Sequence, residues 1–305
     1  MGKIAFIFSG QGAQYGGMGQ DFYNASDASK AVFDKADGVR ANTMNQCFGG
    51  DAETLAVTEN TQPCLFTTEM AMAAALTEAG IKADCVAGFS LGELAALSFA
   101  GALEFDAMLA LVVKRAALMQ EAAEKHPAKM AAVLKLKNEE VEALCADIDG
   151  AYPVNFNCPG QVTVSASEEA MPLLMAKVKE AGGRAMPLKV GGGFHSPFMD
   201  EAAEAFAAVL KDTAFSPLSV PVYANVSGCA YSEDVREDLS LQMNHAVKWE
   251  AIVRQIIEDG CDTFIEVGPG ETLTGMMKRI DKDVRVFSAE NVEKLNKIVQ
   301  EVKPC

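Results

Sequence analysis

A serine between two glycines, Ser90 in the segment Gly88-Phe89-Ser90-Leu91-Gly92, is the residue of this chain best placed to act as a nucleophile. A short, mostly apolar run (84–87) precedes it and an alanine- and leucine-rich run (94–100) follows it, which predicts a strand, a sharp turn and a helix. The glycines let the backbone bend tightly, and the turn holds the hydroxyl out at the end of the sheet. The helix directs its positive N-terminal end at any negative charge that forms near the serine.

A serine hydroxyl needs a neighbouring base to act as a nucleophile at neutral pH, and histidine is the usual one. The chain has three histidines. His126 ends a predicted helix and His245 precedes another, so exposed or capping roles are the simpler interpretation for both. His195 follows three glycines and precedes Ser196 and Pro197, which predict a helix start with Ser196 as its N-cap. We therefore favour His195 as the base over a structural role.

The partner of that histidine is not evident among the acidic residues. No aspartate between Ser90 and His195 stands in a suitable position, since Asp147 and Asp149 end a predicted helix elsewhere in the fold. The pattern therefore indicates a backbone carbonyl as the third group, which makes the pair a dyad.

Arg115 is a charged residue inside the apolar stripe of a predicted helix, 105–123. An unpaired buried charge is costly, so the guanidinium needs an anionic partner. A structural ion pair and a side chain that reaches the surface are the ordinary interpretations. Near a nucleophile, a planar two-pronged cation also suits the carboxylate of a substrate.

The glycine-rich segment 10–19 follows the first predicted strand and invites comparison with a dinucleotide-binding loop. Its spacing is one residue too long for that motif, and Asp34 lies within a helical pattern instead of ending a strand. We interpret the segment as backbone amides and Gln11 placed beside the serine turn, where they form part of an oxyanion hole.

Composition and charge limit the classes of function. The chain has 305 residues, of which 50% are hydrophobic and 22% charged, as expected for a globular protein with a large core. Its eight cysteines are scattered without a C-x-x-C pair, which favours reduced thiols in the cytoplasm and no metal site. The net charge of −16 and the lack of long apolar runs argue against nucleic-acid and membrane partners.

Strand and helix patterns alternate along much of the chain and predict an α/β fold with a mostly parallel sheet covered on both faces. Residues 128–190 differ, because their pattern is βαββαβ, the ferredoxin-like arrangement. We expect a discontinuous core of 1–127 and 191–305 with 128–190 as an inserted subdomain. The predicted strands are 4–8, 84–88, 131–136, 152–157, 162–166, 184–190, 220–225 and 263–267. The main predicted helices are 27–36, 63–79, 105–123, 139–148, 168–181, 197–211, 246–259, 272–280 and 291–303.

The order and spacing of these motifs resemble the malonyl-CoA:acyl carrier protein transacylases, the stand-alone acyltransferases of bacterial type II fatty acid synthesis. The resemblance extends over nearly the whole chain. It rests on segments 8–14, 60–63, 88–93, 155–161, 194–196 and 266–270, with Arg115 and Trp249. Three positions depart from the usual family pattern: Phe89 replaces a histidine, Ser9 a proline, and Lys248 a glutamine found in some members.

The resemblance implies a fold and a role for each site residue. The fold is an α/β-hydrolase-like core with a ferredoxin-like subdomain. Ser90 is the nucleophile, His195 the base, and Arg115 binds the free malonyl carboxylate. The amides of Gln11 and Leu91 form the oxyanion hole.

Three further residues have implied supporting roles. The position of Lys248 orients the histidine through its backbone carbonyl. Asn157 belongs to the substrate site, and Phe194 disfavours acyl groups with a 2-methyl branch by crowding them.

The implied activity is transfer of a malonyl group from malonyl-CoA to the phosphopantetheine thiol of acyl carrier protein, by a ping-pong mechanism through a malonyl-Ser90 ester. Neither a metal nor a bound cofactor is expected, because the CoA thioester and phosphopantetheine are substrates, and we expect a monomer. Two alternatives stay open: the same acyl transfer for a polyketide assembly line, and hydrolysis by a serine esterase. An acidic carrier would need a basic patch on this acidic chain, for which the candidates are Lys189, Lys248, Lys278 and Arg279.

Overall fold

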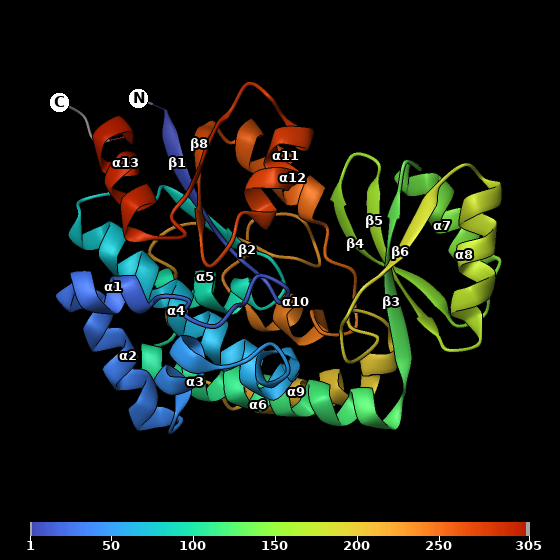
Figure 1. The fold of residues 1–305 in the computed structure, drawn as a ribbon, viewed down its shortest axis with the longest axis horizontal. Helices are drawn as coiled ribbons and strands as arrows, with labels where there is room; N and C mark the ends of the chain where they lie inside the picture. The colour runs from blue at the N-terminus through green and yellow to red at the C-terminus, as the bar shows by residue number, and fades with distance from the viewer. Residues whose placement is uncertain (1, 303–305) are drawn as a thin grey trace.

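The computed structural model describes residues 2–302, in which a five-stranded parallel sheet has the order β7-β2-β1-β8-β9 (Figure 1). Its strands are β1 (Lys3–Phe8), β2 (Cys85–Gly88), β7 (Val222–Tyr223), β8 (Cys261–Val267) and β9 (Arg285–Ser288). The register sets Phe8 beside Gly88 on one side and Val267 on the other, so three strands end at the same edge. The carboxyl edge of an open parallel sheet is where ligands bind in such folds.

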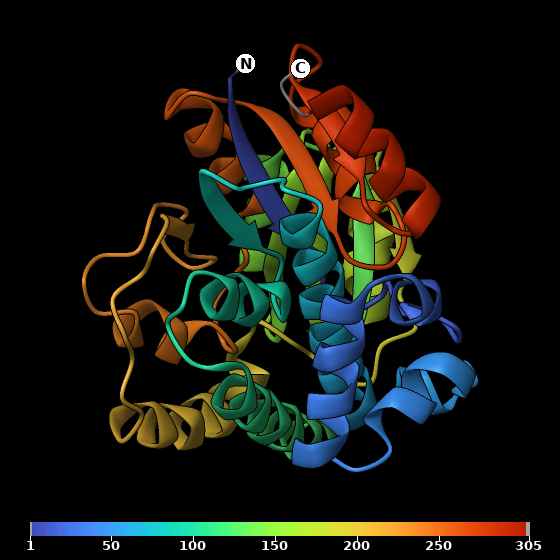
Figure 2. The same cartoon turned by 90° about the vertical axis from the view of Figure 1, so that its left-hand side faces the viewer.

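Helices cover both faces of this sheet (Figure 2). Alternate residues of β1 show this, because Phe6 and Phe8 belong to the core formed with α4, α5 and α6, whereas Ala5 and Ile7 pack in the core formed with α11 and α12. Within residues 2–302 no helix is long and apolar enough to cross a membrane. The helices around the sheet are α1 (Gln20–Ala25), α2 (Asp27–Val39), α3 (Thr43–Gly49), α4 (Thr58–Glu78), α5 (Gly92–Phe99), α6 (Phe105–Lys125), α9 (Asp200–Lys211), α10 (Arg236–Leu241), α11 (Trp249–Glu258), α12 (Thr272–Ile280) and α13 (Val292–Val302).

A separate antiparallel sheet, with the order β4-β5-β3-β6, lies to one side of the parallel sheet (Figure 1). Its strands are β3 (Ala128–Leu134), β4 (Ala151–Cys158), β5 (Gln161–Ser167) and β6 (Arg184–Pro187), and its helices are α7 (Asn138–Ala146) and α8 (Ala170–Glu180). The two helices lie on the outer face of this sheet. The chain order βαββαβ and this strand order confirm the predicted fold class. The domain boundaries at 127/128 and 190/191 stay a prediction.

The structure corrects several predicted elements. β9 was not predicted, and α4 begins at Thr58 instead of Pro63, because the amides of Asn60 and Thr61 already donate to the Val57 carbonyl (both 2.9 Å). The sequence pattern placed the start at the proline, since proline favours the first helical turn.

The predicted helix start at Ser196 and Pro197 is confirmed only for a 3₁₀ turn, and the Ser196 side chain does not cap it. The Ser196 hydroxyl donates to the Gly193 carbonyl (2.6 Å), and Pro197–Met199 forms one 3₁₀ turn before α9 begins at Asp200. The serine therefore fastens the glycine-rich segment instead of capping the helix.

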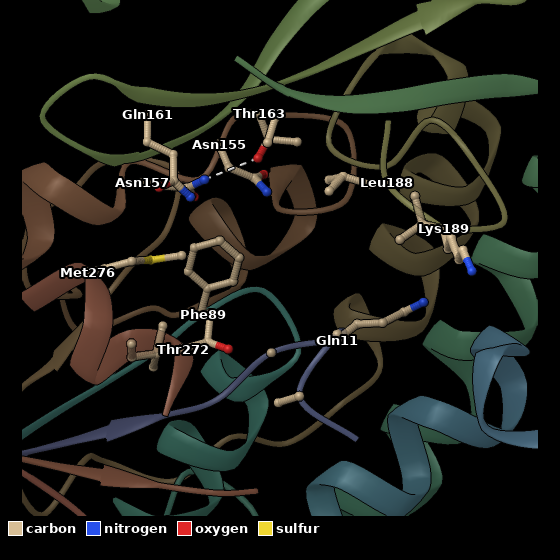
Figure 3. A pocket seen from close by; sticks show the side chains of 16 residues that line it. Gln11, Phe89, Asn155, Asn157, Gln161, Thr163, Leu188, Lys189, Thr272 and Met276 are labelled. Carbon is tan, nitrogen blue, oxygen red and sulfur yellow. Dashed lines mark hydrogen bonds between the residues drawn. The ribbon is translucent and has the colours of Figure 1, made fainter. Parts of the chain in front are cut away.

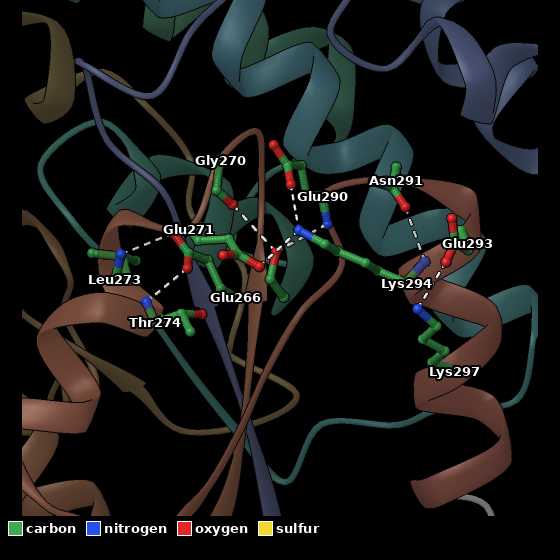
Figure 4. Close-up of polar contacts among 11 residues, drawn as sticks. Glu266, Gly270, Glu271, Leu273, Thr274, Glu290, Asn291, Glu293, Lys294 and Lys297 are labelled. Atoms are coloured by element: carbon green, nitrogen blue, oxygen red, sulfur yellow. Dashed lines mark hydrogen bonds and ion pairs between the residues drawn. The ribbon is translucent and has the colours of Figure 1, made fainter.

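A buried carboxylate fixes the start of α12 against the end of β8 (Figure 4). Glu266 accepts hydrogen bonds from the backbone N–H groups of Leu273 (2.9 Å) and Thr274 (2.7 Å). Negative charge is favoured at a helix N-terminus, where these N–H groups have no partner within the helix. The contact holds α12 at the carboxyl edge of the parallel sheet.

The turn between β2 and α5 depends on two glycines. A Cβ atom at Gly88 would lie 1.9 Å from the carbonyl carbon and oxygen of Gly92, and a Cβ at Gly92 would lie 2.3 Å from the carbonyl oxygen of Ser9. These neighbours are backbone atoms, which cannot move aside without displacing the strand or the helix. Both positions therefore require glycine for close approach.

We predict that Gly88→Ala lowers the free energy of unfolding by about 3 kcal/mol or more, since the new methyl group overlaps backbone. Gly38→Ala is the matched control. Nothing lies within 4 Å of an added Cβ at Gly38 in α2, so the helix should gain about 0.5–1 kcal/mol. Denaturant unfolding measures both, and a Gly88→Ala variant as stable as the wild type would contradict the packing described.

Candidate active site

Ser90 and His195 meet at the carboxyl edge of the parallel sheet. Ser90 lies on the turn between β2 and α5, and its Oγ is 2.7 Å from Nε2 of His195. Both residues have positive φ, 54° and 61°, a region that costs a non-glycine residue about 1–3 kcal/mol. Asn225 holds the serine there, because its Oδ1 accepts from the Ser90 N–H and its Nδ2 donates to the Gly88 carbonyl (both 2.7 Å).

The histidine is oriented from its other ring nitrogen. Nδ1 of His195 lies 2.8 Å from the backbone carbonyl of Gln242. A carbonyl can only accept, so Nδ1 carries the proton and Nε2 is free to accept the proton of the serine hydroxyl. The structure thus places a backbone carbonyl beside the histidine, as the sequence indicated.

That carbonyl does not come from Lys248, which the family resemblance implied. The Lys248 carbonyl accepts the N–H of Ile252 in the first turn of α11 (3.0 Å). The expectation for Lys248 is therefore wrong, because the carbonyl beside Nδ1 of His195 is that of Gln242.

Burial sets the protonation state of the site. His195 is 4% exposed, and burial together with the neighbouring charge of Arg115 lowers the pKa of His195 to about 4. Arg115 is 1% exposed, and burial lowers its pKa to about 10. At neutral pH the imidazole is therefore an uncharged base and the guanidinium is still a cation.

Arg115 points from α6 to the reacting serine. Its Nη2 lies 3.3 Å from Ser90 Oγ, and Nη1 donates to Oε1 of Gln62. Nε and Nη2 both donate to Oε1 of Gln242 (3.2 and 2.7 Å). Within residues 2–302 no carboxylate forms an ion pair with this guanidinium. Neutral amides hold the cation, which leaves its charge available to an anionic group beside the serine.

Ser90, His195 and Arg115 line one small cavity of about 80 Å³. Phe194, predicted to crowd branched acyl groups, is also in its wall. The remaining lining residues are Gln11, Phe89, Leu91, Met119, Met130, Asn155, Leu188 and Val190. A space of this size suits a short acyl group.

Gln11 and Leu91, whose backbone amides the resemblance assigns to an oxyanion hole, line the same cavity. Across residues 2–302, neither N–H donates to another protein atom. Leu91 is the residue before α5, and the Gln11 side chain is fixed by the hydroxyl of Thr58 (3.0 Å). Their assignment to an oxyanion hole stays a prediction, which these two unpaired N–H groups beside a nucleophile support.

A larger cavity, about 390 Å³, adjoins the small one and is shown in Figure 3. The two cavities share part of their lining, namely Gln11, Phe89, Asn155, Leu188 and Val190. Asn157 lies in this larger space and not beside Ser90, with its Nδ2 donating to Thr163 (3.1 Å). The Oδ1 atoms of Asn155 and Asn157 are buried without a hydrogen-bond partner among the described residues.

The departures at Phe89 and Ser9 have structural explanations. Phe89 packs edge-on against Trp249 (centroids 5.5 Å apart) and borders both cavities. The Ser9 hydroxyl donates to Oε1 of Glu69 (2.6 Å), a carboxyl whose pKa is raised by burial. Neither substitution removes a group from the reacting set.

Comparison with known proteins identifies the class to which this fold and site belong. The acyl transferase domain family matches residues 5–302, and the chain belongs to that family. The protein is therefore an acyltransferase.

Named relatives and solved structures confirm the narrower resemblance drawn from the sequence. The chain is 38% identical over 311 residues to the malonyl CoA-acyl carrier protein transacylase of Bacillus subtilis, covering 99% of this chain and 98% of the relative. The crystal structure of the Clostridium perfringens transacylase superposes with a TM-score of 0.95 at 37% identity, covering 98% of this chain and 97% of the other. The structure of a malonyl-transacylase in complex with a type II PKS acyl-carrier protein superposes with a TM-score of 0.94 at 32% identity, covering 98% of this chain and 99% of the other.

Sequence reasoning missed the residues that hold the site together, chiefly Gln62, Glu93, Asn225 and Gln242. Gln62 and Glu93 lie inside motifs already recognised, yet nothing in their spacing shows what they contact. Asn225 and Gln242 are more than 130 residues from Ser90 in the chain, and only the folded backbone brings them to it.

We predict that His195 titrates with a pKa of about 4. The chain has three histidines, so the imidazole signals in an NMR titration are few, and His195→Ala identifies the relevant one. The unfolded chain binds a proton near pH 6.5 and the folded one near 4, so this residue makes folding less favourable as pH falls through that interval. A His195 signal that titrates at the value of free histidine would contradict the buried, neutral base.

Proposed function

We propose that this acyltransferase moves a malonyl group from malonyl-CoA to the phosphopantetheine thiol of an acyl carrier protein and so supplies fatty acid elongation. The observation that carries this proposal is the buried Arg115 guanidinium, 3.3 Å from the Ser90 hydroxyl and without a carboxylate of its own among the described residues. A malonyl thioester has a carboxylate at the far end of a three-carbon acyl group. Bound in the small cavity, it would place that carboxylate on Arg115 and its carbonyl carbon at the serine.

The first half-reaction forms a malonyl ester. Ser90 Oγ attacks the thioester carbonyl carbon while Nε2 of His195 takes the hydroxyl proton. The amides of Gln11 and Leu91 stabilise the oxyanion. The carbon–sulfur bond then breaks, and the CoA sulfur leaves with the proton from Nε2.

The second half-reaction runs the same steps with a different thiol. The phosphopantetheine thiol gives its proton to His195 Nε2 and attacks the ester carbonyl, and the Ser90 oxygen recovers the proton as it leaves. Water must not attack the ester in place of the thiol. A small and largely buried cavity limits the access of water. On this account no metal or bound cofactor takes part.

The larger cavity supplies the path for the pantetheine arm, which CoA and the carrier have in common. Asn155 and Asn157 line this path, and their side-chain amides are groups to which the amides of the arm could hydrogen-bond. This gives Asn157 a role in binding the arm and not in the chemical step. A cytoplasmic, monomeric enzyme with 128–190 as an inserted subdomain stays part of the same proposal.

Service to a polyketide assembly line is the second candidate. The similarity to a malonyl-transacylase in complex with a type II PKS acyl-carrier protein supports it, over 98% of this chain. The chemistry at Ser90 is the same in both pathways, so comparison of fatty acid and polyketide carriers as acceptors distinguishes them.

We predict ping-pong kinetics that depend on Ser90. With malonyl-CoA and a carrier protein varied together, double-reciprocal plots should be parallel, because CoA leaves before the carrier reacts. Ser90→Ala should abolish transfer, and His195→Ala should slow acylation by about 10²–10⁴-fold while circular dichroism shows a folded protein. Intersecting plots, or appreciable transfer by Ser90→Ala, would contradict the ester intermediate.

Arg115 should determine the preference for malonyl over acetyl groups. Arg115→Ala should cost the malonyl reaction on the order of 2–5 kcal/mol, because a buried charge pair loses one member, and should cost acetyl-CoA far less. Arg115→Lys should restore only part of the loss, since an ammonium cannot form the two-pronged contact. Equal losses in kcat/KM for the two thioesters would mean that the arginine is structural.

A basic patch should recruit the acidic carrier. Lys189 lines the larger cavity, and Arg279 binds Gln161 at its rim (2.7 Å), whereas Lys248 lines a different cavity beside Phe156. Charge reversal at Lys189, Lys278 and Arg279 should raise the carrier KM severalfold, an effect that salt weakens, and Lys248→Glu is the matched control. Free pantetheine as acceptor should be affected less. An unchanged carrier KM in the triple variant would place docking on another surface.

A further inference from the structure

Gln242 is a buried residue that forms hydrogen bonds with each of Ser90, His195 and Arg115. Its backbone carbonyl accepts from His195 Nδ1 (2.8 Å), its Oε1 accepts from Arg115 Nη2 (2.7 Å), and its Nε2 donates to the Ser90 carbonyl (2.6 Å). It lies at the end of α10 and is 1% exposed. The side chain and the backbone of this residue therefore have separable tasks.

Only one orientation of the Gln242 amide satisfies its surroundings. Oε1 faces the guanidinium, which can only donate, and Nε2 faces the Ser90 carbonyl and Oε2 of Glu93 (2.8 Å), which accept. Rotation of the amide by half a turn would set donor against donor and acceptor against acceptor. Arg115 on one side and two acceptors on the other thus keep the amide in place.

Glu93 holds the Gln242 amide and is itself held by other residues. It is fully buried, and its Oε1 accepts from the hydroxyl of Tyr231 (2.6 Å) and the N–H of Asn225 (3.0 Å). Burial raises the pKa of Glu93 to about 7, while these hydrogen bonds and the charge of Arg115 oppose the rise. The Gln242 amide lies between the Glu93 carboxylate and the Arg115 guanidinium. The carboxylate is therefore close enough to offset the positive charge but does not itself bind the guanidinium.

We infer that Glu93 and Gln242 are positioning residues that set the preference of the site for acyl groups with a carboxylate. Glu93 fixes the Gln242 amide, and the amide fixes the plane of the Arg115 guanidinium beside Ser90. A direct ion pair would consume the face of the guanidinium that a substrate needs, whereas the intervening amide leaves it open. The inference rests on the proposed function, because the carboxylate in question is that of the malonyl group.

The test measures single-turnover acylation of Ser90 by malonyl-CoA and by acetyl-CoA, with Gln242→Met and Glu93→Gln. Gln242→Met keeps the backbone carbonyl that orients His195, and Glu93→Gln keeps the shape of the side chain but replaces an acceptor oxygen by a donor. Each variant should lower the malonyl-to-acetyl ratio of acylation rates by on the order of tenfold or more, chiefly through the malonyl reaction.

Glu266→Gln is the matched control, because Glu266 is an equally buried glutamate that contacts the start of α12 and none of Ser90, His195 and Arg115. It should lower stability and keep the ratio of the wild type. A folded Gln242→Met or Glu93→Gln with the wild-type ratio would overturn the inference, and either variant alone decides it if the other does not fold. A wild type that shows no preference for malonyl-CoA would overturn the proposed function instead.

Discussion

A guanidinium buried without a carboxylate partner among the described residues is the constraint on which the rest of this site depends. A buried charge is costly, and the chain offsets that cost for Arg115 with two glutamine amides and with Glu93 one contact further away. The same positive charge helps to lower the pKa of His195, so the base is neutral when it is needed. The charge of Arg115 thus adds to burial in keeping the base neutral, and in the proposed function the same charge selects the acyl group.

The strained backbone at the dyad follows from the same arrangement. Ser90 and His195 both have positive φ, and strain of this kind persists only where the surroundings over-determine it. Asn225 and Gln242 hold the Ser90 backbone from two sides, and the Met243 carbonyl accepts the N–H of His195 (2.9 Å). Residues from the second half of the chain therefore keep the serine turn of the first half in its reactive shape.

Sequence reasoning reached the parts of this structure that local patterns encode. Glycine spacing and apolar runs were enough to predict the turn at Ser90, the βαββαβ order and the carbonyl-partnered dyad. They could not show which carbonyl orients His195, because Gln242 is 47 residues away in the chain and only the folded backbone brings the two together. Hydrogen bonds between residues far apart in the chain, such as those of Asn225, leave no periodic signal to read.

In the proposed function, Ser90 carries the acyl group between two thiols. Mass spectrometry of the intact protein mixed with malonyl-CoA, without an acceptor, tests it most directly. We expect a mass increase of one malonyl group, located by peptide mapping on Ser90 and lost when a phosphopantetheine-bearing carrier protein is added. No covalent increase, or a malonyl group on any other residue, would contradict it.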